Sequence, residues 1–258
     1  MLQDLFSLDG RVALITGGNR GIGLGLARGF RDAGAQVAIT GRDAEQNAEA
    51  IAELGEAHAV HALDVRDEEA VERTVAQVVE RFGRLDILVN NAGQFIGGSM
   101  LETAKADWDA VIATHLTGSF LCAKHAARAM VAAGNGGKII NIGSIYSLFG
   151  NPTGASYATA KTGVLGLTRS HAAELGAKNI QVNAILPGWI LTAMTADMPG
   201  TPRGDDTLRK TPAGRWGECE DLVGTAVFLA SAASDFVTGA AIPVDGGYAI
   251  SERFYSDA

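Results

Sequence analysis

The sequence predicts an α/β fold in which a doubly wound, parallel, seven-stranded sheet is covered by helices on both faces. Short runs rich in β-branched residues alternate with longer amphipathic stretches along the 258 residues, and this alternation is typical of parallel strands joined by helices. The runs are almost entirely apolar, as expected of strands that are buried on both faces. No linker or internal repeat interrupts the pattern, which therefore predicts a single domain over residues 1–258.

Each element follows from its local pattern. The predicted strands are RVALIT from residue 11, QVAIT from 36, AVHAL from 59, DILVN from 86, KIINI from 138, IQVNAI from 180 and AAIPV from 240. Amphipathic patterns predict helices at 21–33, 43–54, 67–82, 103–133, 155–177 and 219–231. The stretch 188–215 contains Pro199, Pro202 and Pro212 and is predicted to be irregular. Because a loop of that length in a compact domain is usually functional, we expect it to be a substrate lid.

Composition and charge narrow the class of protein. Apolar residues make up 47% and charged residues 19% of the chain, which is enough for a large core. The net charge of −8 comes from 21 basic and 29 acidic side chains, and the basic ones are scattered, which disfavours a nucleic-acid-binding surface. Cys122 and Cys219 stand far apart, without the Cys or His spacing of a zinc site. We therefore expect no metal site and a reducing compartment.

The first ten residues, MLQDLFSLDG, carry two aspartates and lack a basic start or an apolar run. No later segment has the roughly 18 uninterrupted apolar residues that a membrane span needs. We expect a cytoplasmic protein without a membrane partner.

A glycine-rich turn follows the first predicted strand. The sequence TGGNRGIG places Gly17, Gly21 and Gly23 between that strand and the next helix. Glycines there allow a tight turn and let a pyrophosphate approach the helix N-terminus, whose free N–H groups attract anions. The spacing is Gly-x3-Gly-x-Gly and differs from the commoner GxGxxG, and a chance turn among 33 glycines is the alternative. Its position is the one at which dinucleotides bind in Rossmann sheets, so it predicts a dinucleotide cofactor.

The end of the second strand, ITGRD, bears on the choice between NADP and NAD. Asp43, with Gln46 three residues later, has the pattern of a helix cap. Arg42 and Arg20 then remain as candidates for binding a 2′-phosphate, unless they are merely solvated. NADP is favoured and NAD is possible. Asp64, at the end of the third strand, is placed either to accept from the adenine amino group or to begin the following helix.

These motifs together resemble the short-chain dehydrogenase/reductase family of the short, single-domain type. The resemblance rests on TGxxxGxG at 16–23, NNAG at 90–93, Ser144 and YxxxK at 157–161, in that order. Only one of the four tyrosines has a lysine four residues later. The resemblance covers essentially the whole chain, including PG at 187 and 188 and DGG at 245–247. Through GNGGKIINI and PAGRWG, the chain is most similar to the branch of gluconate 5-dehydrogenases and keto-deoxy-sugar-acid dehydrogenases.

The resemblance implies roles for three catalytic residues. Tyr157 would give a proton to the substrate oxygen in reduction and take it in oxidation, while the nicotinamide carries the hydride. A free tyrosine titrates near ~10, which is high for a base at neutral pH. Lys161, one helical turn further on and helped by the oxidised nicotinamide, is expected to lower that pKa through its positive charge and to bond the cofactor ribose. Ser144 would donate to the substrate oxygen and stabilise the charge that develops there.

The resemblance also implies a set of cofactor-binding residues. Asn91 and Gly93 of the NNAG motif are expected along the cofactor, and Thr192, five residues after Pro187, resembles the residue that holds the carboxamide. The full expected set is Gly17, Asn19, Arg20, Gly21, Ile22, Gly23, Arg42, Asp64, Val65, Asn91, Gly93, Tyr157, Lys161, Gly188, Ile190 and Thr192.

One position departs from the family pattern. The helix after NNAG usually carries an asparagine, in a VNxxGxF context, whose backbone helps to hold a water in a proton relay to the lysine. This chain reads ATHLTGSF, with His115 at that position. A histidine is itself a proton carrier near neutral pH, so His115 joins the catalytic candidates. Alternatively, it is a buried residue that packs at a helix distortion.

The substrate is the least defined part of the prediction. We expect pocket walls from 190–215 and from Gln94, Phe95, Ile145, Tyr146, Asn151 and Trp189. Arg203, Arg209 and Lys210 could meet a carboxylate or could be solvated. A polyol, sugar or sugar acid is the expected substrate, and a 3-oxoacyl thioester reductase shares the same motifs. A non-catalytic NADPH-binding sensor or scaffold is a third possibility. The resemblance also implies a homotetramer, with interfaces at 103–133 with 155–177 and at the last strand.

Overall fold

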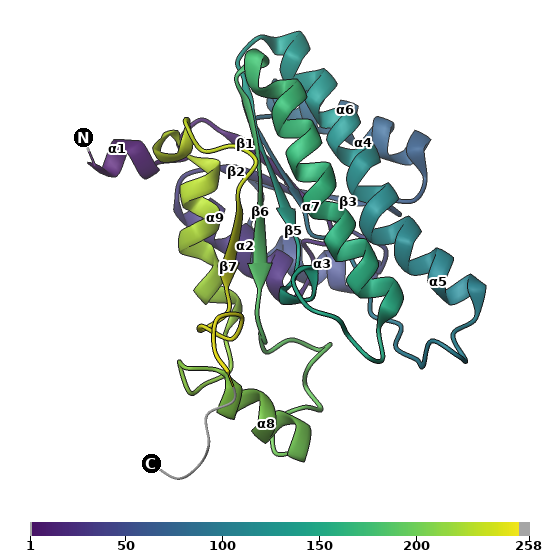
Figure 1. The fold of residues 1–258 in the computed structure, drawn as a ribbon. Coiled ribbons are helices and arrows are strands. Elements are labelled where there is room, and N and C mark those ends of the chain that lie inside the picture. Colours follow the sequence, from purple (N-terminus) through teal and green to yellow (C-terminus); the bar gives the residue numbers. More distant parts are fainter. Residues whose placement is uncertain (1, 253–258) are drawn as a thin grey trace.

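The computed structural model describes residues 2–252 and contains one seven-stranded parallel sheet (Figure 1). In the strand order β3-β2-β1-β4-β5-β6-β7, β2 and β3 are added on one side of β1, and β4 to β7 are added on the other side. This order confirms the predicted fold class. The predicted domain also includes residues 1 and 253–258, which lie outside the described part. The strands are β1 (Val12–Ile15), β2 (Gln36–Gly41), β3 (Ala59–Ala62), β4 (Ile87–Asn90), β5 (Gly137–Ile142), β6 (Ile180–Pro187) and β7 (Ala241–Val244).

Helices cover both faces of this sheet, as Figure 1 shows. One face carries α2 (Gly21–Asp32), α3 (Ala44–Leu54) and α9 (Val223–Ala230). The other carries α4 (Glu68–Phe82), α6 (Gly118–Ala133) and α7 (Ala155–Leu175), with α5 (Lys105–Ile112) packed against α7. A short helix α1 (Leu2–Phe6), which the sequence pattern did not predict, precedes β1.

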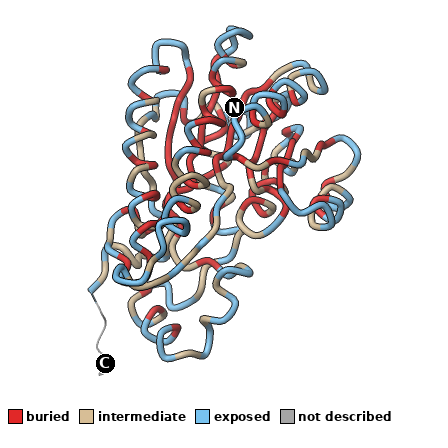
Figure 2. The backbone as a smooth tube through the Cα atoms, turned by 90° about the vertical axis from the view of Figure 1, so that its right-hand side faces the viewer, coloured by how far each residue is buried: buried red, intermediate tan, exposed pale blue. Residues whose placement is uncertain are grey.

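The core consists of two apolar layers, one on each side of the sheet. Leu14 and Leu88 point into the layer under α4, α6 and α7, whereas Ile15 and Ile87 point into the layer under α2, α3 and α9. Because successive side chains of a strand face opposite sides, both sets must be apolar when both faces are covered. Figure 2 shows the strands buried in the middle of the molecule. This is why the strands could be identified as continuous apolar runs.

Two helix starts follow the predicted chemistry. Asp43 precedes α3, and its carboxylate accepts a hydrogen bond of 3.0 Å from the backbone N–H of Gln46, which confirms its assignment as a cap. Asp67 caps α4 in the same way through the N–H of Ala70. The helix-start alternative for Asp64 is therefore wrong, because Asp67 occupies that position.

The predicted helix at 103–133 is interrupted. Between α5 and α6, residues Ala113–Thr117 form one π-helical turn. Nearby hydroxyl groups bond carbonyls around it: Thr114 Oγ1 donates to Ala110 O at 2.8 Å, and Ser119 Oγ donates to His115 O at 2.7 Å. Such turns occur mainly as single insertions in α-helices, often at functional sites.

The segment 188–215 is not wholly irregular, and the prediction was wrong there. It contains α8 (Pro202–Lys210), whose N-cap Thr201 accepts from the N–H of Gly204 at 3.1 Å. Proline breaks a helix interior but suits the first helical position, because its missing N–H has no helical partner there. Pro202 therefore begins the helix instead of preventing it.

All seven strands are parallel, so their carboxyl ends meet at one edge of the sheet. Figure 1 shows α8 and the rest of 188–215 beyond this edge. In open parallel sheets the crevice outside the carboxyl ends, at the point where strand order reverses, is where ligands bind. Within residues 2–252, no helix combines the length and the apolar character needed to cross a bilayer.

Candidate active site

A cavity of about 960 Å³ lies at the carboxyl edge of the sheet. The segments that follow β1, β2, β3, β4, β5 and β6 all contribute to its lining, together with α7 and part of 188–215. Its position agrees with the prediction from strand order. One continuous cavity therefore joins the glycine turn to the residues expected to carry the chemistry.

The glycine turn requires glycine at each of its three positions. Gly17 and Gly21 have φ angles of +61° and +51°, which favour a residue without a Cβ. A Cβ on Gly23 would lie 2.3 Å from the carbonyl oxygen of Gly17 and 2.5 Å from Asn91 Nδ2. Gly23 thus packs behind the turn and is not among the residues that line the cavity, and its contact with a cofactor stays a prediction.

Asn91 holds the turn in shape. Its Nδ2 donates to the carbonyl oxygens of Thr16 at 3.0 Å and Gly17 at 2.9 Å, which ties the end of β4 to the end of β1. The helix α2 begins within the turn sequence, at Gly21, and its N-cap Arg20 makes no side-chain capping hydrogen bond. The first N–H groups of α2 are therefore available to an anion. These features fit a dinucleotide pyrophosphate.

Charged groups gather at the end of the cavity next to β2 and β3. Arg20 and Arg42 are exposed and line it, as predicted for a 2′-phosphate. Asp43 is used as a helix cap. Asp64 is held by Arg66, whose Nε lies 2.9 and 3.0 Å from its two carboxylate oxygens. These hydrogen bonds keep the pKa of Asp64 low.

Arg66 is a site neighbour that the sequence interpretation missed. It follows Asp64 by two residues in LDVRD, and this close spacing was the available signal. Because the guanidinium already bonds the Asp64 carboxylate, contact with an adenine amino group would have to share that carboxylate with Arg66.

Ser144 and Tyr157 meet at the opposite end of the cavity. Ser144 precedes a short 3₁₀ turn (Ile145–Ser147), and its Oγ accepts from the N–H of Tyr146 at 3.1 Å. Tyr157 lies in the first turn of α7, and its hydroxyl interacts with the side chain of Ser144. Burial raises the pKa of Tyr157 to about 12, although the bond to Ser144 acts in the opposite direction. Without the cofactor, Lys161 therefore does not lower this pKa as expected, and the lowering in the presence of the oxidised nicotinamide stays a prediction.

The surroundings of Lys161 explain why its charge does not lower the pKa of Tyr157. Its Nζ lies 5.6 Å from the centre of the Tyr157 ring and donates to the carbonyl oxygen of Ile142 at 2.6 Å. The side chain is buried, and burial lowers the pKa of Lys161 to about 7. A buried amine is costly to charge, so near neutral pH it carries only part of the positive charge assumed from the sequence.

His115 occupies the π-helical turn and is only 2% exposed. Its Nε2 lies 2.7 Å from Gln94 O and 3.1 Å from Gln94 N, and its ring meets Tyr157 edge-on with centres 5.2 Å apart. A Cβ on Gly93 would lie 2.3 Å from His115 Cε1, so the ring fills the space that this glycine leaves open. Burial lowers the pKa of His115 to about 3.

The imidazole of His115 is thus neutral at physiological pH. The expectation that it titrates near neutrality is wrong for this environment, because burial disfavours the charged form. Its contacts favour the alternative of a residue that packs at a helix distortion. The backbone carbonyl of His115 accepts from Ser119 Oγ.

The cavity brings together every predicted site residue except Gly23. It also confirms the predicted walls Gln94, Phe95, Ile145, Tyr146, Asn151 and Trp189. Of the three basic residues considered for a carboxylate, Arg203 lines the cavity, whereas Arg209 and Lys210 do not. The predicted wall 190–215 contributes Met194, Thr195 and Met198, whereas Leu63, Thr114 and Ile142 are lining residues that the sequence interpretation missed. The apolar ones lacked any motif that would separate them from core residues.

Comparison with known proteins agrees with this arrangement. A family model described as enoyl-(acyl carrier protein) reductase matches residues 17–249, which include the three glycines of the turn and all four catalytic candidates. The chain belongs to the short-chain dehydrogenase/reductase family. As a member of this family it is an NAD(P)-dependent oxidoreductase.

Relatives within the short-chain dehydrogenase/reductase family cover nearly the whole chain. A 2-dehydro-3-deoxy-D-gluconate 5-dehydrogenase from Escherichia coli is 41% identical over 96% of this chain and 99% of its own length. A gluconate 5-dehydrogenase from Gluconobacter oxydans is 42% identical over 96% and 98%. The crystal structure of a gluconate 5-dehydrogenase from Burkholderia cenocepacia in complex with NADP and tartrate has a TM-score of 0.93 and 41% identity, with 98% and 100% coverage.

Proposed function

We propose that this protein is an NADP-dependent dehydrogenase that interconverts a secondary alcohol and a ketone in a sugar acid or a related sugar or polyol. The observation that carries the proposal is the meeting of Ser144, Tyr157 and Lys161 with the glycine turn in one cavity. Relatives named as gluconate and keto-deoxy-gluconate dehydrogenases support the substrate class. The relative described as an NADP complex supports the cofactor.

The nucleotide would lie along the predicted binding residues. Arg20 and Arg42 would hold the 2′-phosphate at the β2 end, while Asn19, Ile22, Asp64 and Val65 line the same end. Gly188, Ile190 and Thr192, after β6, would hold the nicotinamide end. When bound, the cofactor supplies or accepts the hydride at its nicotinamide.

The catalytic side chains move the proton and hold the substrate oxygen. With a pKa of about 12, the Tyr157 hydroxyl is protonated at neutral pH and ready to donate in reduction. Ser144 Oγ would donate to the same substrate oxygen and stabilise its developing charge. Lys161 Nζ, with a pKa of about 7, can hold or release a proton near neutral pH beside the Tyr157 ring.

The remaining family expectations also form part of the proposal. The segment 188–215 would act as a lid, since it lies beyond the strand ends and lines the cavity. The protein would form a homotetramer in the cytoplasm. Both cysteines are free thiols, in agreement with a reducing compartment.

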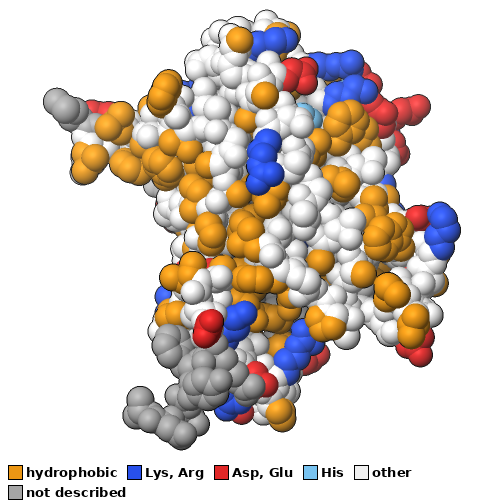
Figure 3. Space-filling model, viewed as in Figure 1, with side chains coloured by type: hydrophobic (Ala, Val, Ile, Leu, Met, Phe, Trp, Pro, Cys, Tyr) orange, Lys and Arg blue, Asp and Glu red, His pale blue; other side chains and the backbone are white. Residues whose placement is uncertain are grey.

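Exposed apolar surface supports the assembly. Phe120 and Val131 on α6 are 43% and 41% exposed, and Figure 3 shows apolar side chains gathered over α1 and α9. Leu2, Leu5 and Phe6 of α1 belong to this surface. Light scattering after size exclusion would test the assembly, and a monomeric mass would contradict it.

The activity is tested by following NADPH absorbance with 5-keto-D-gluconate, D-fructose and acetoacetyl-CoA. Tyr157→Phe should lower turnover by about 10²- to 10⁴-fold, because it removes the phenol proton. Its affinity for NADPH should stay close to that of the wild type, because only one oxygen is lost. Tyr248→Phe is the matched control, since Tyr248 does not line the cavity.

The outcomes separate the competing functions. Turnover of acetoacetyl-CoA alone would identify a 3-oxoacyl thioester reductase. Binding of NADPH without turnover of any of the substrates would indicate a sensor and overturn the proposed reaction.

A further inference from the structure

We propose that Arg203 of α8 selects anionic substrates by binding their carboxylate while the reacting carbon lies at Tyr157. This inference rests on the proposed function and assigns a substrate-binding role to a residue outside the family motifs. The ligand class is a sugar acid, in preference to a neutral sugar or polyol of the same length.

Arg203 lies close to the catalytic end of the cavity, which it lines. Its guanidinium carbon is 5.7 Å from the centre of the Trp189 ring, and its hydrogen bond and its charge lower the pKa of the Tyr146 hydroxyl against the larger effect of burial. The Tyr146 ring in turn lies 6.4 Å from the Tyr157 ring and 6.1 Å from the Trp189 ring. Arg203 is therefore separated from the catalytic phenol by a single aromatic side chain.

The other basic residues of this region already have partners. Arg209 pairs with Asp206 on the same helix, and Arg215 pairs with Asp221 at 2.6 Å. Lys210 Nζ lies between two aromatic rings, 4.8 Å from the centre of Phe149 and 4.2 Å from that of Tyr248. Arg203 contacts Trp189 and Tyr146 and has no carboxylate within salt-bridge distance among residues 2–252, and it alone of these four basic residues lines the cavity.

Two buried donors in the same wall also lack an acceptor within the described chain. They are Asn151 Nδ2 and Trp189 Nε1, and both residues line the cavity. Asn151 is 7% exposed, and its Oδ1 already accepts from Thr153 N at 3.1 Å, which leaves its amide N–H groups as the unused part.

Buried polar groups in proteins are nearly always hydrogen-bonded, so unpaired donors at a cavity wall indicate a ligand with acceptors. A guanidinium and two N–H donors together fit a carboxylate with neighbouring hydroxyl groups. A neutral polyol could satisfy the two donors but would leave the guanidinium without an anion. The unmatched positive charge is what distinguishes the sugar acid.

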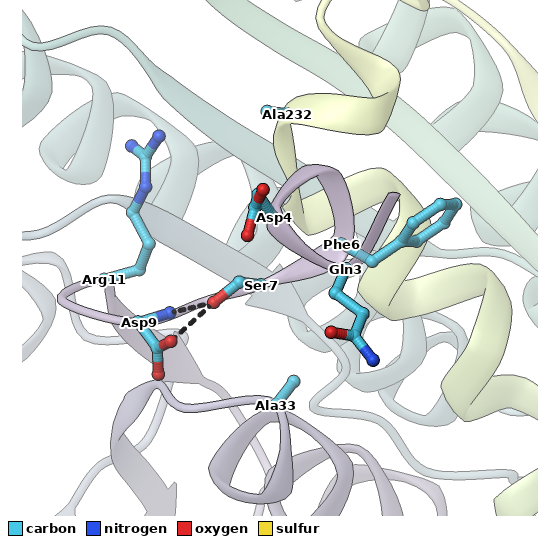
Figure 4. A pocket seen from close by; sticks show the side chains of 8 residues that line it. All are labelled: Gln3, Asp4, Phe6, Ser7, Asp9, Arg11, Ala33 and Ala232. Carbon is cyan, nitrogen blue, oxygen red and sulfur yellow. Dashed lines mark hydrogen bonds between the residues drawn. The ribbon is translucent and has the colours of Figure 1, made fainter. Parts of the chain in front are cut away.

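A second cavity, of about 770 Å³, differs from the catalytic cavity in that polar side chains of its wall have partners within the protein (Figure 4). It lies beside α1, where Ser7 Oγ donates to Asp9 at 2.8 Å and Arg11 pairs with Asp86 at 3.5 Å. Because these polar groups bond one another or nearby residues, they do not indicate a ligand.

The test compares matched charged and neutral substrates in the full-length enzyme. The proteins compared are the wild type, Arg203→Gln and Arg203→Lys. Oxidation is measured with NADP on D-gluconate and D-glucitol. Reduction is measured with NADPH on 5-keto-D-gluconate and D-fructose. Arg209→Gln is the control, because it removes a cation from the same helix outside the cavity. The intrinsic tryptophan fluorescence, to which Trp189 against Arg203 contributes, would give the Kd of D-gluconate without turnover.

Arg203→Gln should raise the KM and the Kd for the acids by about tenfold, since an exposed charge-assisted bond is lost. The same substitution should leave kcat, the KM for the neutral substrates and the Kd of NADPH within about twofold of the wild-type values. Arg203→Lys should recover part of the loss, and Arg209→Gln should match the wild type.

An equal loss on acids and neutral substrates, an unchanged KM for the acids, or a changed Kd for NADPH would overturn the assignment of Arg203. Each of these results would leave the oxidoreductase activity standing. If the wild type oxidises and reduces none of the substrates, the proposed function fails, and the D-gluconate fluorescence titration still decides whether Arg203 binds an acid.

Discussion

The two ends of the cavity are built in different ways. At the nucleotide end three polar side chains are bonded to the protein itself: Asn91 to the glycine turn, Asp43 to the start of α3, and Asp64 to Arg66. At the substrate end, Asn151 Nδ2 lacks such a partner within residues 2–252, and Arg203 contacts Tyr146 and Trp189 without a carboxylate partner among those residues. The nucleotide site is therefore preformed by backbone shape, whereas substrate choice depends on side chains that complete their bonding with the ligand.

The strongest way to break the preformed end is Gly23→Ala. The new Cβ would lie 2.3 Å from Gly17 O, so the turn must shift or the protein loses about 1–3 kcal/mol of stability. We expect the Kd of NADPH, measured by fluorescence titration, to rise by about 10- to 100-fold. Gly166→Ala, on α7 with no atom within 4 Å of its Cβ, is the helical control. Equal NADPH binding by both variants would show that the turn is not preformed.

The next largest effect concerns the buried Lys161. Its pKa is about 7 in the folded protein and near ~10.4 when unfolded, so the unfolded chain binds more protons between these values. The stability of the wild type should therefore rise with pH in this window and gain about 2 kcal/mol from pH 7 to pH 9.

Lys161→Met removes this titration. Urea unfolding at both pH values should show the gain in the wild type and in Lys105→Met, an exposed-lysine control, but not in Lys161→Met. A gain of the same size in all three proteins would mean that the amine at 161 keeps an ordinary pKa.

Arg42→Ala probes the charge at the nucleotide end. Loss of a bond to the 2′-phosphate should raise the Kd of NADPH by about tenfold and leave that of NADH nearly unchanged. Arg73→Ala, which removes an exposed cation on α4, controls for net charge. If the two cofactors lose affinity equally, Arg42 does not distinguish them.

The smallest effect is expected for His115→Asn. Because the imidazole is neutral and its carbonyl is already bonded by Ser119, turnover should stay within about threefold of the wild type or rise. Steady-state kcat with 5-keto-D-gluconate gives the measurement. Complete loss of activity would show that the imidazole itself is needed.

The sheet and the nucleotide end could be predicted because each depends on local rules. Strands covered on both faces must be apolar throughout, and a turn with positive φ at Gly17 and Gly21 favours glycine. Asp43 was separated from the ribose site because the spacing to Gln46 indicates a cap. In each case the residue type and its neighbours in sequence were sufficient.

The substrate end could not be predicted in the same way, because its contacts are made across the fold. The sequence offers three basic residues in this segment and no pattern that distinguishes them: Arg203, Arg209 and Lys210. Because α8 begins at Pro202, Arg203 lines the cavity and the other two do not. The pKa shifts of Tyr157 and Lys161 come mainly from burial, which residue spacing does not reveal. The π-helical turn at His115 likewise interrupts a pattern that reads as one helix.

The packing of the His115 ring against Gly93 makes the two positions genetically dependent. The His115 imidazole occupies the space that the methyl group of an alanine at position 93 would need. A smaller side chain at position 115 must therefore be introduced before a larger one at position 93. Directed evolution of the loop after β4 should therefore randomise codons 93 and 115 together. In a library that varies position 93 alone, every larger side chain would clash with the His115 ring.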